Sequence, residues 1–373
     1  MRKVLHYVGR MNRGGMETLI MNLYRNIDQN KVQFDFAVHT KEKSDFDEEI
    51  IDAGGKLYTF PSYRKNPFAY RRAWRDFFRC HKNEYTAFHF HTNSLANIVA
   101  LEEAARAGVP IRIVHSHSSF ANKGRLQKIN NFLHMRHRRK LKLLATNLYA
   151  CSQKAAEWLY GGMCLDGINV EVINNGVDCE AFCFCSESYE EKCKELGIEN
   201  KIVVGHIGKF IEVKNHSFLI DIVAEMVKSD NRIICLLIGD GKLFDKTKKQ
   251  CEAYGISDHV KFLGVRSDIS ELLMCMDLFI MPSLYEGLPV SMIEVQASGV
   301  PALISDTISS EVKINSNVEF CSLTNTAKEW ADTAFMMIKK GRIYDNSAIT
   351  NAGYDIKVTA RKYLELIGGE PID

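Results

Sequence analysis

The chain has 373 residues, of which 46% are hydrophobic and 25% are charged, and these values are typical of a globular protein with two domains of ordinary size. No apolar run approaches the roughly 18 residues of a membrane span, and the first residues do not read as a signal peptide, so a cytoplasmic protein is expected. Residues 1–178 hold 27 Lys and Arg against 17 Asp and Glu, whereas residues 179–373 hold 21 against 29, which predicts a first domain suited to an anionic surface or acceptor.

Apolar strand patterns alternate with helical patterns along the first half of the chain. The predicted strands cover residues 3–8, 34–39, 87–91, 111–114, 146–151 and 170–173. This alternation is typical of a parallel sheet with helices on its faces. Gly14 and Gly15 end the first loop, just before a helix predicted over residues 16–26, and two glycines there would let a phosphate approach the backbone closely. Another helix is predicted over residues 95–107.

Two His-x-His pairs end neighbouring predicted strands, namely His89 with His91 and His115 with His117. Alternate positions of a strand point the same way, so the members of each pair could share a face. Four imidazoles could bind zinc or iron, but no carboxylate or cysteine accompanies them at ligand spacing. Structural histidines are therefore favoured, and no metal is expected.

A strongly basic segment runs from Lys123 to Lys142 and contains eight Lys and Arg, while no acidic residue occurs between Glu103 and Glu157. Several apolar residues of this segment fall on one helical face. A basic amphipathic helix can lie on an anionic membrane surface. The alternative is a surface helix whose apolar face belongs to the ordinary core.

The second half of the chain repeats the alternation of strands and helices. Predicted strands cover residues 201–208, 232–238, 260–263 and 278–281, and predicted helices cover 217–227, 291–297, 327–340 and 358–366. Lys209 and Lys214 lie in the loop after the first of these strands, where they could clamp a diphosphate, although two solvated loop lysines would look the same. Gly239 and Gly241 lack the third glycine of a dinucleotide-binding loop, which disfavours a nicotinamide cofactor.

Residues 277–304 form a strand, a loop, a helix and a second apolar run. Glu286 and Glu294 have seven residues between them. The loop and helix start between them contain the free backbone N–H groups that bind anions at a helix N-terminus, here those of Gly287, Leu288 and Val290, next to Pro289. A simpler interpretation is a capping box in which Glu294 bonds back to Ser291.

Several motifs together resemble the retaining family-4 glycosyltransferases, and the likeness is strongest for bacterial enzymes of exopolysaccharide and capsule synthesis. The motifs follow one another in family order along nearly the whole chain: MNRGGMETLIMNLYR, HSHSS, INNGVD, VGHIGKFIEVKNHSFLI, PSLYEGLPVSMIEVQASGVPAL and AGYDIKV. The resemblance implies the GT-B fold, with two Rossmann-like parallel-sheet domains facing a central cleft. It implies an acceptor domain over residues 1–178, joined by a last helix at about 355–373, and a nucleotide-sugar domain over 195–354.

The resemblance also implies a role for each motif residue. His117, with His115 as the substitute, would lie near the transferred sugar. Glu286 would orient that sugar, while Lys209 and Lys214 would hold the diphosphate without a metal or another cofactor. The implied donor site comprises Gly14, Gly15, Lys209, Lys214, Val265, Arg266, Glu286, Gly287, Leu288, Pro289, Val290 and Glu294.

The function implied is transfer of a sugar, with retention of configuration, from a nucleoside diphosphate sugar to a growing polysaccharide unit. A uridine diphosphate sugar is the expected donor and a lipid-linked saccharide the expected acceptor. No nucleic-acid partner is expected, and the protein could be peripheral at the inner face of the membrane. Two alternatives stay open at this point, a nucleotide-sugar epimerase of the same fold and a non-catalytic nucleotide-sugar binder.

Overall fold

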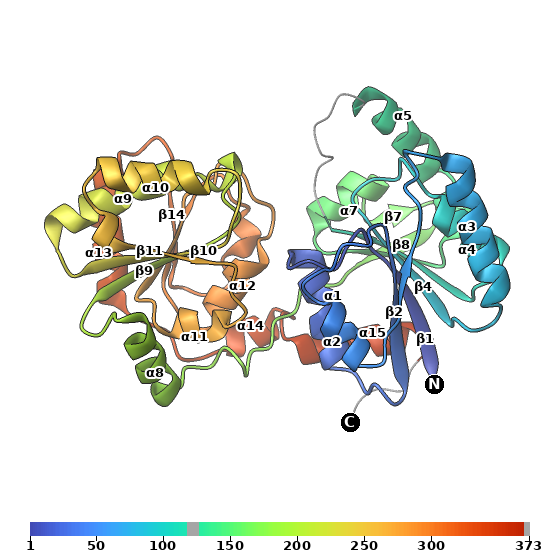
Figure 1. Cartoon of the computed structure of the whole chain (residues 1–373), viewed down its shortest axis with the longest axis horizontal. Helices are drawn as coiled ribbons and strands as arrows, with labels where there is room; N and C mark the ends of the chain where they lie inside the picture. Colours follow the sequence, from blue (N-terminus) through green and yellow to red (C-terminus); the bar gives the residue numbers. More distant parts are fainter. Residues whose placement is uncertain (118–126, 369–373) are drawn as a thin grey trace. The chain divides into compact units, whose positions relative to one another are not determined.

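The computed structural model describes residues 1–117 and 127–368. The chain divides into two compact units, which are described separately (Figure 1). Unit 1 contains residues 1–176 together with the chain from Ile356 onward, and unit 2 contains Val177–Asp355. No helix in the described ranges combines the length and the apolar character that crossing a bilayer requires.

Unit 1 is built on an eight-stranded sheet with the strand order β3-β2-β1-β4-β5-β6-β8-β7. All neighbouring strands are parallel except β7 and β8, which form an antiparallel pair. The strands are β1 Arg2–Tyr7, β2 Val32–Val38, β3 Leu57–Thr59, β4 Ala87–Thr92, β5 Ile111–Ser116, β6 Asn147–Ala150, β7 Cys164–Leu165 and β8 Ile168–Val172. The parallel α/β architecture predicted for this half is confirmed.

Helices cover both faces of this sheet. They are α1 Gly15–Arg25, α2 Asp47–Asp52, α3 Pro67–Cys80, α4 Val99–Arg106, α5 Gln127–Arg138, α6 Leu141–Leu144, α7 Gln153–Tyr160 and α15 Ile356–Leu366. One hydrophobic core joins the sheet to α3, α4 and α7, and a second core joins the other face to α1, α2 and α15. Alternate residues of each central strand enter opposite cores, as the two-residue period of a strand requires.

Unit 2 contains a six-stranded parallel sheet with the order β11-β10-β9-β12-β13-β14. Its strands are β9 Ile202–Ile207, β10 Ile233–Ile238, β11 Val260–Gly264, β12 Leu278–Met281, β13 Ala302–Ser305 and β14 Val318–Cys321. The central strands are fully buried, which explains why they read as continuous apolar runs rather than as alternating patterns.

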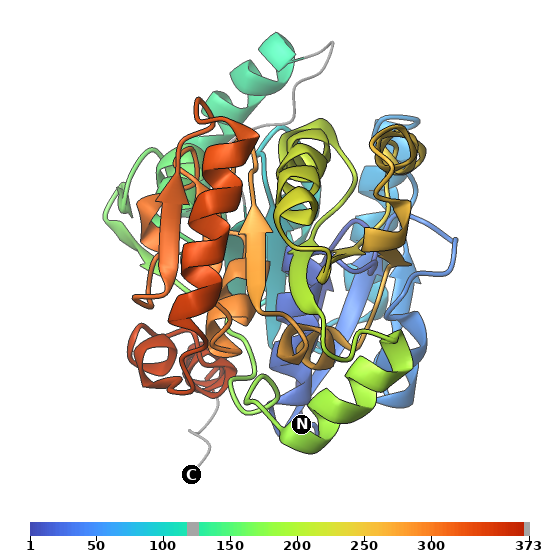
Figure 2. The same cartoon turned by 90° about the vertical axis from the view of Figure 1, so that its left-hand side faces the viewer.

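The helices of unit 2 again lie on both faces of the sheet (Figure 2). They are α8 Ser186–Leu196, α9 His216–Ser229, α10 Phe244–Ala253, α11 Ile269–Met274, α12 Val290–Ala297, α13 Ala327–Lys340 and α14 Ser347–Asn351, with short 3-10 turns at η1 Glu212–Lys214, η2 Ser257–His259 and η3 Ser310–Val312. The helices α9 and α13 pack on one face, and α11 and α12 pack on the other. The prediction of a second parallel-sheet domain is confirmed.

Two predicted helices differ in the structure, one in where it begins and one in being divided in two. The helix predicted from residue 95 begins only at Val99, because the side chains of Ser94 and Asn97 accept hydrogen bonds from the backbone N–H groups of Ala96 and Val99 and so favour turns. The basic segment forms α5 and α6 instead of one helix, and its residues Lys123–Leu126 lie outside the described residues.

Candidate functional site

The loop between β12 and α12 holds the residues expected to bind the donor. The helix begins at Val290, with Pro289 in an extended conformation as its N-cap and no side chain capping it. Ser291 is therefore inside the first turn, and the alternative interpretation, in which Ser291 forms a capping box with Glu294, is wrong. The N–H of Met292 donates to the carbonyl of Pro289, whereas those of Val290 and Ser291 have no acceptor among the described residues and remain open to a ligand.

A close ion pair joins this loop to the loop after β9. The Nζ atom of Lys214 lies 2.7 Å from Oε1 of Glu286, and the two side chains are only 15% and 18% exposed. The loops meet because β9 and β12 are neighbours in the sheet, and the amide N–H of Leu284 donates to the carbonyl of Val213 across 2.8 Å. Sequence reasoning named both charged residues but did not foresee that they pair with each other.

The backbones of the loops after β9 and β10 lie very close together beside the Lys214 side chain. A Cβ atom added to Gly208 would lie 3.2 Å from the side-chain carbons of Lys214, and one added to Gly239 would lie 2.2 Å from the carbonyl oxygen of Gly208. Gly241 has a φ of +156°, and a Cβ atom added to it would lie 2.7 Å from the carbonyl oxygen of Phe210. Bare backbone is therefore required where the loops after β9 and β10 touch.

Glu294 lies on α12 with its side chain half-buried. No hydrogen bond or ion pair to its carboxyl group is found among the described residues. Burial raises the pKa of Glu294 to about 7, because the charged form loses its hydration there. A carboxyl group with no protein partner and a pKa near neutrality is suited to accept hydrogen bonds from ligand hydroxyl groups.

Three other residues predicted to bind the donor differ in how accessible their side chains are. Lys209 is exposed, and Val265 is 60% exposed. The guanidinium group of Arg266 instead makes a bidentate ion pair with Asp268, with contacts of 2.8 and 2.5 Å. The Nε and Nη2 atoms of Arg266 are therefore held by Asp268, and its assignment to the donor site stays a prediction.

Two buried histidines beneath this loop were missed in the sequence. The Nδ1–H of His206 donates to the carbonyl of Ile280 across 2.8 Å. The ring centroids of His206 and His216 are 4.8 Å apart. Burial and the nearby Lys214 ammonium group lower the pKa of His216 to about 4. Their signal was weak, because each lies alone in an apolar pattern.

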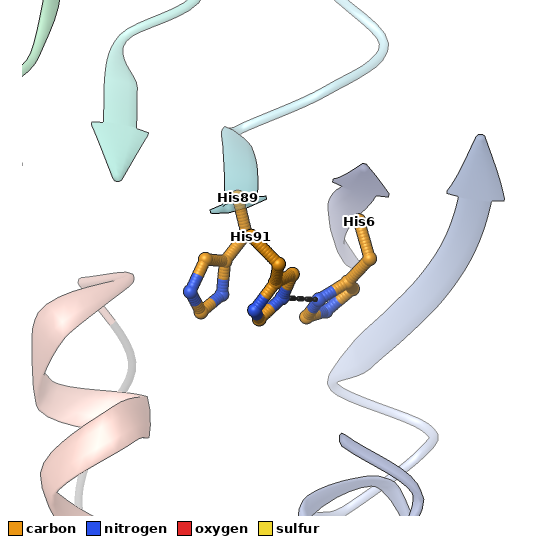
Figure 3. Close-up of side chains that lie close together, drawn as sticks. All are labelled: His6, His89 and His91. Atoms are coloured by element: carbon orange, nitrogen blue, oxygen red, sulfur yellow. Dashed lines mark hydrogen bonds between the residues drawn. The ribbon is translucent and has the colours of Figure 1, made fainter. Parts of the chain in front are cut away.

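A cluster of five histidines occupies unit 1, on the sheet face that carries α1 and α15. It contains both predicted pairs and adds His6 of β1, which pairs in register with His89 of β4. Figure 3 shows His6, His89 and His91 side by side, with a 3.0 Å contact between Nδ1 of His6 and Nε2 of His91. His6 was not singled out from the sequence, because the register between two strands distant in the chain cannot be read from either strand alone.

The two candidates for the active-site histidine differ in exposure. His115 is 1% exposed, whereas His117, just after β5, is half-buried. Burial lowers the pKa of His117 to about 3, so its imidazole is neutral near pH 7. Accessibility favours His117 of the two. In the same unit, Gly14 is the extended N-cap of α1, which begins at Gly15.

The basic helix α5 projects from the rest of unit 1 (Figure 1) and exposes apolar side chains. Ile129, Phe132 and Met135 are 57%, 65% and 54% exposed and follow one another at helical spacing. The alternative in which the apolar face of this helix belongs to the ordinary core therefore does not hold for Ile129 and Phe132, although Leu141 is buried. Arg138 turns inward, donating to the carbonyls of Trp158 and Leu159.

Comparison with known families places two adjoining matches on the chain. Residues 13–181 match the model described as Glycosyltransferase Family 4, and residues 188–352 match the model described as Glycosyl transferases group 1. EpsF of Bacillus subtilis (strain 168), which is named as a glycosyltransferase, is 37% identical over 366 residues, covering 95% of this chain and 93% of EpsF. The capsular polysaccharide biosynthesis glycosyltransferase CapH of Staphylococcus aureus is 24% identical and covers 98% of both chains. A UDP-Gal:alpha-D-GlcNAc-diphosphoundecaprenol alpha-1,3-galactosyltransferase of Escherichia coli is 28% identical over 60% of this chain and 59% of its own length.

Solved structures show the same fold. Anabaena HepE in complex with UDP matches with a TM-score of 0.76 and 17% identity, covering 99% of this chain and 100% of HepE. WaaG, described as a glycosyltransferase involved in lipopolysaccharide biosynthesis, matches with a TM-score of 0.64 and 14% identity over 97% of this chain and 95% of WaaG. At these identities the likeness establishes the fold, which is GT-B.

Proposed function

The chain belongs to the glycosyltransferase family of EpsF, and its two parts match the models of Glycosyltransferase Family 4 and Glycosyl transferases group 1. From that premise we propose that it transfers a sugar from a nucleoside diphosphate sugar to a lipid-linked polysaccharide unit with retention of configuration. A uridine diphosphate sugar is the proposed donor. The observation that carries the proposal is the group formed in unit 2 by the Lys214–Glu286 ion pair, the unpartnered carboxyl of Glu294 and the uncapped N-terminus of α12.

Each part of this group has a chemical task in the proposed reaction. The departing diphosphate gains negative charge in the transition state, and Lys214, exposed Lys209 and the N–H groups at the start of α12 offset that charge. Lys214 can bind Glu286 and the diphosphate at the same time, because an ammonium group has three N–H donors and the ion pair with Glu286 uses one of them. In this scheme the diphosphate needs no metal ion.

The two glutamates are assigned to hydroxyl groups of the donor. The pairing with Lys214 fixes the carboxylate of Glu286 in one orientation, so that its second oxygen can accept from hydroxyl groups of the transferred sugar. Glu294, with no protein partner, accepts from the ribose. His117 of unit 1 is proposed to contact the sugar or the acceptor as a neutral imidazole.

The proposed acceptor is anionic and held at a membrane. The E. coli relative is named for a diphosphoundecaprenol acceptor, which is an anionic lipid carrier. In this chain, α5 combines the exposed Ile129, Phe132 and Met135 with the exposed Arg136 and Arg139, a pattern suited to the surface of an anionic bilayer. We therefore place the working enzyme at the inner face of the membrane.

A thermal-shift panel of uridine, guanosine and adenosine diphosphate sugars tests the donor. A bound ligand raises apparent stability by mass action, so only the true donor class should shift the melting temperature at low concentration. Turnover of that donor is then measured with and without a lipid-linked acceptor. Consumption that does not depend on the acceptor would favour an epimerase, and tight binding without any turnover would favour a non-catalytic binder.

A further inference from the structure

The histidine cluster of unit 1 contains a continuous line of hydrogen-bonding contacts that begins at Tyr363 on α15. The hydroxyl of Tyr363 lies 3.5 Å from Nε2 of His6, and Nδ1 of His6 lies 3.0 Å from Nε2 of His91. Nδ1 of His91 lies 2.8 Å from Nε2 of His117. We call this line the first arm, and it leads from the hydroxyl of Tyr363 to the proposed active-site histidine.

A second arm begins at the same hydroxyl. Tyr363 lies 3.2 Å from Nδ1 of His89, and Nε2 of His89 lies 3.2 Å from Nδ1 of His115. Both arms end on neighbouring rings, since the centroids of His115 and His117 are 4.1 Å apart. At these ends, Nε2 of His115 and Nδ1 of His117 are buried and have no hydrogen-bond partner in the described part of the chain.

Counting protons fixes how the two arms are related. A neutral imidazole carries one N–H and one bare nitrogen, so each histidine passes on the direction of the hydrogen bond that it receives. The five histidines are neutral near pH 7, because burial lowers the pKa of each of them. The hydroxyl of Tyr363 has a single hydrogen and is buried. If it accepted from both arms, that hydrogen would have no acceptor among the described residues, so the hydroxyl donates into one arm and accepts from the other.

Two arrangements satisfy every contact. If Tyr363 donates to His89, all five histidines carry their proton on Nε2, and the free ends are an N–H donor on His115 and a bare Nδ1 on His117. If Tyr363 donates to His6, all five carry their proton on Nδ1, and the two ends exchange roles. In both arrangements one end donates and the other accepts. The shorter contact of Tyr363 is the one to His89, which favours the Nε2–H arrangement.

We propose that Tyr363 is a positioning residue that locks His115 and His117 into one shared tautomer, so that they present a donor and an acceptor side by side to a polar ligand. A sugar hydroxyl fits this pair, because it donates one hydrogen bond and accepts others. The identity of the ligand rests on the function proposed above, whereas the shared tautomer rests only on the contacts. A residue near the C-terminus, distant in sequence from both histidines, thereby sets the chemical form of the sugar-facing imidazole.

A bound metal ion is the competing use of the same nitrogens. The ligand atoms of His6, His89 and His91 lie within 4.8 Å of one another, as do those of His91, His115 and His117. A nitrogen that binds a metal through its lone pair cannot also accept a hydrogen bond from the next ring, so the two uses exclude each other. Metal analysis of the purified protein therefore belongs to the test.

The test is the tautomer of each histidine, measured by long-range proton–nitrogen NMR on protein labelled with nitrogen-15 histidine. In the wild type we expect all five to carry the proton on Nε2, and uniform Nδ1–H forms would still support the coupling by Tyr363. A mixture of the two tautomers among the five, or stoichiometric zinc in the protein, would overturn the proposal. This measurement needs no activity, so it stands apart from the proposed transferase function.

Variants then test whether the hydroxyl of Tyr363 sets the histidine tautomers or whether Tyr363 only packs in the core. Tyr363→Phe removes only the hydroxyl, so His115 and His117 should each average between their two tautomers. The rate constant for sugar transfer should fall by about 10-fold, which is a usual cost of losing a group that orients an active-site side chain. The donor KM should not change. His6→Phe cuts only the first arm, so His91 and His117 should lose their fixed tautomer while His89 and His115 keep theirs. Tyr24→Phe, at a buried tyrosine of the same core that contacts no histidine of the cluster, is the matched control. Unchanged tautomers in Tyr363→Phe would overturn the assignment.

Discussion

The ion pair between Lys214 and Glu286 can be tested by removing its members singly and together. With Lys214→Gln or Glu286→Gln alone, the remaining charge keeps its place at less than one-fifth exposure without a partner. Breaking a fully buried pair costs about 3–5 kcal/mol and breaking an exposed one about 0–1, so a loss of about 1–3 kcal/mol of stability is expected here. The double change leaves no orphaned charge, and most of this stability should return.

Turnover should follow a different pattern from stability. If Glu286 orients the sugar and Lys214 offsets the diphosphate charge, each single variant should lose about 100-fold in turnover, which corresponds to about 2.7 kcal/mol of transition-state stabilisation. The double variant should be no more active than the weaker single variant, because neither group is restored. Stability therefore recovers in the double variant while catalysis does not.

The assays are the thermal unfolding midpoint with and without UDP, and the initial rate of sugar transfer. Lys228→Gln, which removes one member of an exposed pair with Glu225 on α9, is the control and should change neither quantity. Recovery of both stability and turnover in the double variant would refute the catalytic assignment. The pair would then be a structural link between the two loops.

Three further predictions follow from the structure. Burial raises the folded pKa of Glu294 to about 7, so its ionisation destabilises the free protein as the pH rises from about 4.5 to 7. Glu294→Gln should therefore raise the unfolding midpoint more at pH 8 than at pH 5. UDP binding by the wild type is expected to strengthen over the same pH range, and the variant should lack that pH dependence. Transfer should survive treatment with a chelator, and activity lost together with a stoichiometric metal would contradict the proposed metal-free handling of the diphosphate. A triple variant of α5, Phe132→Ser with Arg136→Gln and Arg139→Gln, should lose salt-sensitive binding to anionic vesicles but keep donor binding. The control variant, Lys248→Gln with Lys249→Gln on the exposed side of α10, should still bind the vesicles. If the α5 variant binds vesicles as well as the wild type does, α5 is an ordinary surface helix.

The architecture was largely predictable because burial leaves a plain signal in the sequence. Strands such as β10 and β12 are enclosed on both faces, so every position is apolar and the run stands out. The edge strands β3 and β14 were not predicted, since β3 has only three residues and β14 is buried only at its ends. The long helix α3 was also missed, although Asn66 caps it and Pro67 begins it.

The chemical groups of the site were predictable one by one, but their pairings were not. Glu286 and Lys214 are 72 positions apart in sequence, and only the adjacency of β9 and β12 brings their loops together. The capping box failed for a local reason, because the N-cap is Pro289, two residues before Ser291, which leaves Ser291 inside the first turn. Local patterns specify which groups are present, whereas strand order specifies which of them meet.

In the histidine cluster, too, local patterns predict part of the arrangement and the order of the strands determines the rest. The two-residue period of a strand correctly predicts that His89 and His91 face the same side, and parallel register sets His91 beside His115. The meaning of the cluster nevertheless depends on His6 and Tyr363, which come from the first strand and the last helix. The lack of an acid among the five histidines argues against a metal site, and the hydroxyl of Tyr363 offers a different reason for the cluster, because its single hydrogen would give both arms a direction and make their ends complementary. In the proposed arrangement, the helix that completes unit 1 from the far end of the chain supplies the group that decides which nitrogen of His117 carries the proton.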